Sequence, residues 1–300
     1  LTWWVYQPGS SGAFLFDDWA NLPVLGQRGG VDSADSFVGY LISGIAGPTG
    51  RPVALLSFLL DANAWPADAA PFKHTNVLLH LLNGALLAWL LFRLTRLLGH
   101  AQGCAGWVAA LAAGVWLLHP LMVSTTLYVV QRMAILSGTF VLVGLLAYVH
   151  GRALLDSGRP RAAYGWMSGG VVIGGLLATL SKENGALLPL LVLVLEAGVL
   201  RGKAGVRPRT AWRAVFLYLP VVVILAYLGR YVPNLVDGVS GSRDFTPGER
   251  LLTQARVLVE YLYLLVVPHA HTAGLYHDGM TDSRGLFQPW TTAVALGAIL

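Results

Sequence analysis

The sequence predicts an all-α protein, a polytopic bundle of transmembrane helices, on the basis of its composition and of the length of its apolar runs. Of the 300 residues, 55% are hydrophobic and only 12% are charged, and the mean hydropathy is +0.62. The apolar runs reach roughly 18 residues or more, which is the length that crosses a bilayer core as a helix. The chain begins and stops inside apolar stretches, at Leu1 and Leu300, so we expect both ends to be truncated.

The apolar segments give the expected order of elements, all within one transmembrane domain over residues 1–300. A partial first helix over 1–8 is followed by a long external loop over 9–73, and the remaining helices lie in 74–300. Their apolar segments are at 75–98, 104–121, 133–150, 164–180, 185–200, 211–229, 250–267 and from 289 onward. The segment 250–267 carries Arg256 and Glu260 at helical spacing. It is either a spanning helix with a buried pair or an amphipathic helix on the outer surface.

Positive charge concentrates in alternate connections between these segments. The residues are Arg93, Arg96, Arg152, Arg159, Arg161, Arg201, Lys203, Arg207, Arg209 and Arg213. By the positive-inside rule this side faces the cytoplasm, and the loop 9–73 lies on the opposite side. The net charge of +5 thus reflects orientation in a membrane, and we expect no nucleic-acid partner.

The long external loop has the pattern of short helices rather than of a flexible spacer. Apolar stretches occur at 14–22, 37–45 and 51–65, and tryptophans flank them. Tryptophan is enriched at membrane interfaces, so we expect these helices to lie on the membrane surface and to cover a cavity.

Two adjacent carboxylates, Asp17 and Asp18, stand out at the start of this loop. A solvated helix N-cap is one interpretation of acids before an apolar helix. The other is catalytic: close like charges raise the pKa of one carboxyl group, which then serves as a base for a hydroxyl proton.

Further polar residues lie at or near membrane depth on the same external side. Asn76, His80 and Asn83 follow i, i+4, i+7 spacing, with His74 at the outer end. Such a stripe must face protein or water, so helix-to-helix hydrogen bonding and substrate contact both remain open. The remaining external residues of interest are His119, Gln131, Arg132, Lys182 and Glu183.

Three cations, Arg51, Arg132 and Lys182, converge on this external side and would together hold a negatively charged group such as a lipid-linked phosphate. Simpler interpretations stay open for each motif. Pro120 after His119 can simply terminate a helix, Arg132 can extend to the membrane interface, and Lys182 with Glu183 can form a surface ion pair.

Six motifs in the same order resemble a known family. They are FDDW at 16–19, GRPVALLSF at 50–58, FKHTNVLLHLLN at 72–83, LHP at 118–120, VQR at 130–132 and SKENGALLP at 181–189. The chain resembles the membrane domain of the transmembrane and tetratricopeptide-repeat O-mannosyltransferases and their bacterial relatives, which are glycosyltransferases of the GT-C class.

The resemblance implies a multi-pass enzyme of the bacterial inner membrane whose active site faces the periplasm. It would move a sugar from a polyprenyl-phosphate donor to a hydroxyl of a protein or glycan acceptor, with inversion. By the same resemblance Asp17 is the base and Asp18 orients the acceptor or its partner. Arg51, Arg132 and Lys182 neutralise the leaving phosphate, and Glu183 fixes Lys182. The other expected supporting or substrate-binding residues are His74, Asn76, His80, His119 and Gln131.

The sequence departs from the family after His119, where Leu121 to Ser124 lack the second histidine and the glutamate of animal members. The sugar and the acceptor therefore stay open. A transporter or flippase of a lipid-linked or anionic solute is the main alternative, and a non-catalytic membrane scaffold is a third. His269, His271 and His277 have ligand-like spacing, but we assign no metal site and expect a loop cluster. A divalent-metal requirement stays open.

Overall fold

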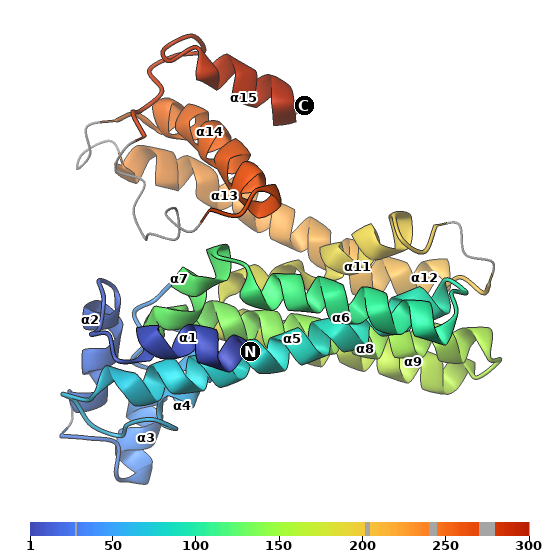
Figure 1. Cartoon of the computed structure of the whole chain (residues 1–300), viewed down its shortest axis with the longest axis horizontal. Helices are drawn as coiled ribbons and strands as arrows, with labels where there is room; N and C mark the ends of the chain where they lie inside the picture. The colour runs from blue at the N-terminus through green and yellow to red at the C-terminus, as the bar shows by residue number, and fades with distance from the viewer. Residues whose placement is uncertain (28, 202–204, 240–244, 270–279, 300) are drawn as a thin grey trace. The chain divides into compact units, whose positions relative to one another are not determined.

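The structure is a computed structural model that describes residues 1–27, 29–201, 205–239, 245–269 and 280–299. Within these residues the secondary structure is helical throughout, apart from turns and a single isolated bridge between Gly285 and Gln288 (Figure 1). The all-α prediction is confirmed.

Four helices of the described chain are long and apolar enough to cross a membrane: Ala69–Leu97, Val129–Asp156, Pro160–Ser181 and Thr210–Tyr231. The number is five if Gln102–Leu118 and Leu121–Leu127 together form one bent span. Among the described helices, the segments predicted at 185–200, 250–267 and from 289 onward are shorter or more polar and do not meet the same criteria.

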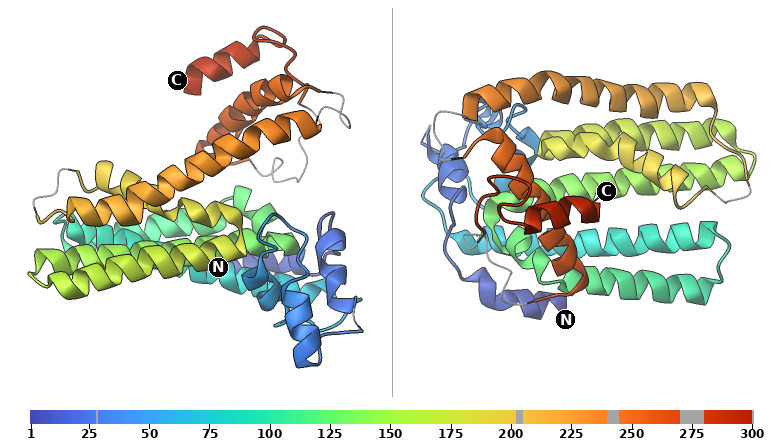
Figure 2. Two further views of the ribbon diagram at one scale, coloured as in Figure 1. Left: turned by 180° about the vertical axis from the view of Figure 1, so that it is seen from behind. Right: turned by 90° about the horizontal axis from the view of Figure 1, so that it is seen from above.

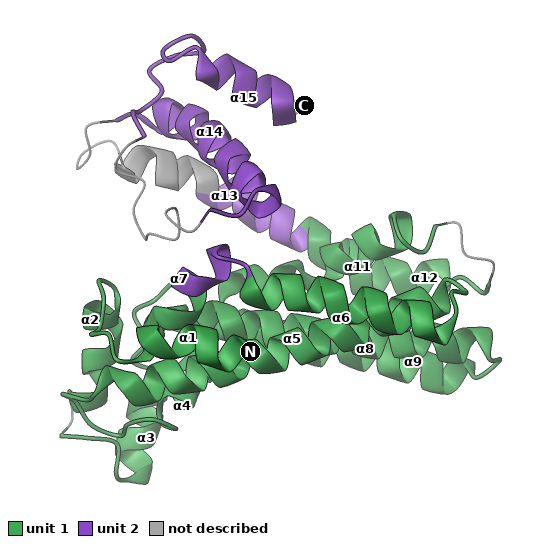
Figure 3. Cartoon of the chain, viewed as in Figure 1, with its two compact units in different colours: residues 1–118, 125–222 green, residues 119–124, 223–300 purple. Residues whose placement is uncertain are grey.

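The chain divides into two compact units (Figure 3). The first unit comprises residues 1–118 and 125–222, and the second comprises 119–124 and 223–300. Nearly all of the candidate site residues belong to the first unit.

The first unit begins with α1 (Thr2–Ser10) and the predicted external loop over 9–73, in which the predicted helices form but are shorter than expected. They are α2 (Asp18–Asn21), the 3₁₀ helix η1 (Leu22–Gly26), α3 (Ala34–Leu41) and α4 (Pro52–Phe58). A capping box between Ser33 and Ser36 starts α3, which satisfies backbone N–H groups that the first turn leaves free.

Long antiparallel helices form the rest of the first unit. The first of them are α5 (Ala69–Leu97), α6 (Gln102–Leu118), α7 (Leu121–Leu127, shared with the second unit), η2 (Val129–Gln131) and α8 (Arg132–Asp156). A continuous run of α9 (Pro160–Gly169), η3 (Gly170–Gly174) and α10 (Gly175–Ser181) follows. The unit ends with η4 (Glu183–Leu187), α11 (Leu188–Ala197), α12 (Thr210–Arg213), η5 (Ala214–Tyr218) and the start of α13 (Leu219–Val239). Further views show α5, α6, α8 and α9 running alongside one another (Figure 2). Because the chain reverses at each connection, the start of α5, the start of α8 and the end of α10 lie at one end of the bundle.

Two kinds of packing hold this arrangement. The loop helices share one apolar core with α5 and α8, in which Leu25, Phe58 and Phe72 are almost fully buried. Glycines let α8 approach the α9–α10 run closely: a Cβ on Gly174 would lie 3.0 Å from the Gly144 Cα, as is common where small residues line helix interfaces. The external loop is thus a packed part of the fold. Its placement on a membrane surface stays a prediction.

The second unit contains residues 119–124, the remainder of α13, α14 (Pro247–Val266) and α15 (Thr291–Ile299). Within α14, Arg256 donates to the Thr281 carbonyl at 2.7 Å and to the Ser283 hydroxyl at 3.3 Å. Of the histidines with ligand-like spacing, His271 and His277 lie outside the described residues, and His269 donates through Nδ1 to the Val267 carbonyl. The described part of the chain contains no group of three His, Cys, Asp or Glu side chains placed to share a metal ion.

Candidate functional site

The two adjacent acids of the first loop have opposite environments. Asp18 is fully buried. Its Oδ1 accepts a hydrogen bond from the Val130 N–H at 2.7 Å and its Oδ2 accepts one from the Leu15 N–H at 2.9 Å. Asp17 is exposed and stands at the N-cap of α2 without a side-chain capping hydrogen bond. The simple capping interpretation therefore lacks its defining contact, and Asp17 is the acid that a substrate can reach.

One carboxyl group of the pair does have a raised pKa, but the physical cause differs from the predicted one. Burial raises the pKa of Asp18, while the backbone N–H groups of Leu15 and Val130 and the charge of Lys73 act in the opposite direction. The expected cause, repulsion by the neighbouring Asp17, is not what raises it. Desolvation disfavours the charged form of an acid in the same way as a like charge does.

A buried tyrosine and a buried lysine complete what we call the acidic cluster: Asp17, Asp18, Tyr128 and Lys73. The Tyr128 hydroxyl accepts a hydrogen bond from the Asp17 N–H at 2.8 Å. Burial and the charges of the two carboxylates raise the pKa of Tyr128 to about 12, so it stays protonated as a donor. Lys73 donates to the Gly9 carbonyl at 3.5 Å. Neither Tyr128 nor Lys73 is among the site residues predicted from the sequence. A lysine inside an apolar run is itself an indication of function, and this signal could have identified Lys73.

A second group of side chains, the cationic cluster, consists of Arg51, Lys182, Glu183 and Gln131. Arg51 precedes α4 with a left-handed φ of 54°. Its Nε and Nη2 both donate to Glu183 Oε2, at 3.1 and 2.7 Å. Burial would raise the pKa of Glu183, but its hydrogen bonds with Arg51 and Thr49 hold it below its ordinary value. The carboxylate of Glu183 is engaged by Arg51 in a two-point pair. Its predicted role in fixing Lys182 stays a prediction.

Lys182 is the less satisfied cation of this cluster. Its Nζ donates to Gln131 Oε1 at 3.5 Å, a long bond to a neutral acceptor. Burial and the nearby Arg51 charge lower the pKa of Lys182, with Glu183 opposing them. Two cations and one carboxylate leave a net positive charge here, which an anion would stabilise.

Arg132 does not belong to either cluster, and its burial and contacts do not favour the predicted role as a phosphate ligand. The side chain is fully buried and forms an ion pair with Asp61 at 2.5 Å. Its guanidinium also donates to Asn76 Oδ1 at 2.6 Å, to the Phe72 carbonyl at 2.6 Å and to the Ser57 carbonyl at 2.9 Å. These contacts involve each of its nitrogens, and the side chain has no exposed surface through which a phosphate could reach it. The alternative of an arginine extended to the interface is excluded by the same burial.

The polar stripe on α5 turns out to bond mainly to neighbouring helices. Besides its bond with Arg132, Asn76 donates to the Val129 carbonyl at 3.3 Å. His80 Nε2 donates to the Leu117 carbonyl at 3.0 Å. Asn83 donates to the Ile135 carbonyl at 2.9 Å. The geometry favours the structural interpretation of all three. At the outer end, His74 stacks on Trp3 with 5.8 Å between ring centroids.

His119 lies in the second unit, and both its ring nitrogens have partners there. Nδ1 accepts from the Leu121 N–H at 3.2 Å, and Nε2 is 3.2 Å from the Leu265 carbonyl. Because Nδ1 accepts, the proton is on Nε2, which donates. His119 thus bonds within the second unit, and its predicted supporting or substrate-binding role stays a prediction.

The two clusters meet through one short segment, η2. The Val130 N–H holds Asp18, and the Gln131 side chain contacts Lys182. Tyr128 and Gln131 are three residues apart, which in a 3₁₀ helix is a rise of about 6 Å. Family models, curated proteins and solved structures were all compared with the chain, and none matches it. The functional conclusion accordingly depends on this geometry and on the motif resemblance.

Proposed function

We propose that the protein is an integral membrane glycosyltransferase of the GT-C type. It moves a sugar from a polyprenyl-phosphate donor to a hydroxyl of a protein or glycan acceptor, with inversion, at the periplasmic face of the bacterial inner membrane. The observation that carries the proposal is the junction at residues 128–131. Tyr128 accepts from the backbone of the exposed Asp17, and Gln131 accepts from the cation Lys182. Glycosyl transfer with a phosphate leaving group requires both kinds of group.

Asp17 is the base in this proposal. The acceptor oxygen attacks the anomeric carbon as its proton passes to the Asp17 carboxylate, and the bond from that carbon to the phosphate oxygen breaks. The exposure of Asp17 and the nearby Tyr128 hydroxyl support this role. Asp18 is a positioning residue, since both its oxygens bind backbone N–H groups that fix the loop against η2.

Lys182 and Arg51 bind the donor phosphate. Negative charge builds on this group as polyprenyl phosphate departs, and cations placed beforehand stabilise it without reorganisation. The weak contact of Lys182 with Gln131 supports the assignment, because a phosphate oxygen would replace a long neutral bond with a charge-assisted one.

A direct test uses the purified protein with a panel of polyprenyl-phosphate sugars and scores release of polyprenyl phosphate together with sugar transfer by mass spectrometry. Asp17→Asn should reduce turnover by about 10²–10⁴-fold, the usual contribution of a general base. Asp35→Asn, an exposed acid in the same loop, is the matched control and should leave turnover unchanged. Equal turnover of the Asp17 variant and the control would exclude Asp17 as the base.

The same assay separates transferase from transporter. A flippase would move the intact donor across sealed vesicles and release no polyprenyl phosphate. Intact donor reaching the opposite leaflet, with no cleavage for any sugar in the panel, would overturn the proposed reaction.

A further inference from the structure

A second candidate binding site lies in the first unit, at the opposite ends of α5 and α8 from the two clusters. It is an open apolar cavity of about 330 Å³ whose walls include Leu86 and Trp89 of α5, Val143 and Ala147 of α8, and Trp166 of α9. None of the residues proposed for sugar transfer takes part in it, so the inference stands independently of that proposal.

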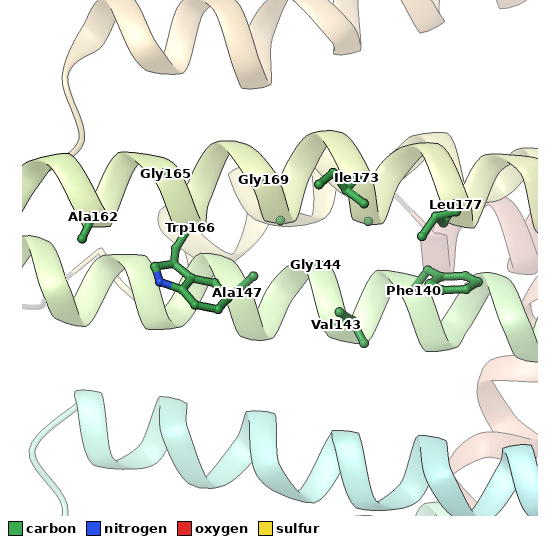
Figure 4. A pocket seen from close by; sticks show the side chains of 12 residues that line it. Phe140, Val143, Gly144, Ala147, Ala162, Gly165, Trp166, Gly169, Ile173 and Leu177 are labelled. Atoms are coloured by element: carbon green, nitrogen blue, oxygen red, sulfur yellow. The ribbon is translucent and has the colours of Figure 1, made fainter.

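The cavity continues into a larger apolar groove of about 580 Å³ between α8 and the α9–α10 run. Figure 4 shows Trp166 reaching from α9 towards α8 beside Ala147, with Val143 farther along the same helix. These three residues line both spaces. Together they form one apolar surface along the helices, long enough for hydrocarbon chains.

The glycines of α9 and η3 that line the groove fall into two groups. One group packs closely against α8, and the other group faces open space. Gly170 and Gly174 make the close contacts with α8, where an added Cβ would lie within about 3 Å of its neighbours. A Cβ on Gly165 or Gly169 would meet no atom within 4 Å. Both line the groove, so the missing side chains keep it open rather than bring helices together.

A pair of hydrogen-bond donors stands at one end of the smaller cavity. Arg93 Nη2 lies 3.4 Å from His150 Nδ1. Arginine can only donate, so Nδ1 accepts and the imidazole proton is on Nε2, free to donate elsewhere. Among the residues that the structure describes, Arg93 forms no ion pair with a carboxylate. The end of the cavity therefore presents the positive charge of Arg93 without a carboxylate partner, which suits a phosphate.

We infer that this cavity binds an anionic phospholipid, with its phosphate at Arg93 and His150 and its acyl chains along the apolar groove. Trp89 and Trp166, each about half exposed (54% and 53%), flank the site in the manner of interfacial aromatics. The site lies on the side where lysine and arginine concentrate, and anionic lipid headgroups are attracted to such regions. Free phosphate would use the donors but leave the groove unfilled.

The test is native mass spectrometry of the full protein in detergent with phosphatidylglycerol and with phosphatidylcholine of the same acyl chains. The wild type should bind phosphatidylglycerol in preference. Arg93→Gln should weaken that binding about fivefold or more, as expected for one interfacial arginine. Arg96→Gln is the matched control, since Arg96 is exposed on the same helix and donates to the His100 carbonyl outside the cavity. It should change binding by less than about twofold.

Three results would overturn the inference: equal binding of the two lipids by the wild type, equal loss in the two variants, or full competition by inorganic phosphate. A second experiment avoids variants altogether. Phosphatidylglycerol with a photoreactive acyl chain should crosslink mainly to residues 86–93 and 143–150 of the wild type. Crosslinks spread equally over the exposed apolar face of α6, around Trp107 and Leu111, would exclude a specific site.

Discussion

Replacing Arg132 by methionine should destabilise the protein strongly, whatever happens to its activity. Arg132→Met keeps the length and apolar stem of the side chain but removes the charge. Asp61, whose side chain is only 3% exposed, would lose its ion-pair partner. The carbonyls of Ser57 and Phe72 and the amide oxygen of Asn76 would also lose a donor.

The expected cost follows from these contacts. Removing one partner of a buried ion pair costs about 3–5 kcal/mol, because the remaining charge stays buried without compensation. The orphaned acceptors push the value towards the upper end of that range, although such terms do not simply add. For a chain of this size we expect the midpoint of thermal unfolding in detergent to fall by roughly 10 °C.

A double-mutant cycle with Asp61→Asn isolates the ion pair. The asparagine keeps an oxygen that can accept from Thr75, which bonds to Asp61 at 2.5 Å. The double variant Arg132→Met, Asp61→Asn should therefore recover about 2 kcal/mol relative to the sum of the single changes. Unchanged stability of Arg132→Met together with a higher KM for the donor would refute this reasoning and restore Arg132 as a phosphate ligand.

Three further predictions concern charge and packing. Lys182→Gln should raise the donor KM at least tenfold. Burial and Arg51 lower the pKa of Lys182, so the wild type should lose donor affinity at a lower pH than a site with an ordinary lysine would. A wild-type KM that does not change with pH would count against the phosphate site. Burial raises the pKa of Asp18 above its value in the unfolded chain, so the folded state binds a proton on this carboxyl group more tightly and stability should rise as pH falls through the raised pKa. In urea unfolding, Asp18→Asn should lack this gain and lose about 1–2 kcal/mol at neutral pH. The same pH profile in the variant and the wild type would contradict the raised pKa of Asp18. Gly174→Leu should cost about 1–3 kcal/mol by overpacking. Gly165→Leu, which meets open space, should cause no loss of thermal stability. Equal losses in the two variants would show that the close contact with α8 is not the cause.

The order and type of the long helices could be predicted because they depend on local properties. An apolar run of sufficient length forms a helix whatever its neighbours are, and α5, α6, α8 and α14 begin and end within several residues of the expected segments. The loop helices were found by the same patterns, but their ends were not. The predicted helix at 51–65 ends at Phe58, and Asp61, three residues beyond that end, forms the ion pair with Arg132.

The candidate site was predicted less well because it depends on contacts between distant residues. Arg51, Arg132 and Lys182 look alike in sequence: each is a cation on the predicted external side of an apolar chain. The side chain of Arg51 remains about one fifth exposed, while Arg132 is fully buried. The ion pair with Asp61 and the backbone carbonyls near it decide this difference, and no residue type in the sequence marks which carbonyls a fold will leave free.

Arg132 still matters for the proposed reaction through its place in the chain. It follows Gln131 directly, and η2 carries both the Val130 N–H that holds Asp18 and the Gln131 side chain that contacts Lys182. The Arg132 contacts with α4 and α5 therefore fix the one segment to which both clusters are attached. A misplacement of about 1 Å is enough to cost on the order of 100-fold in rate, so a buried residue that touches no substrate can control the distance between base and phosphate site.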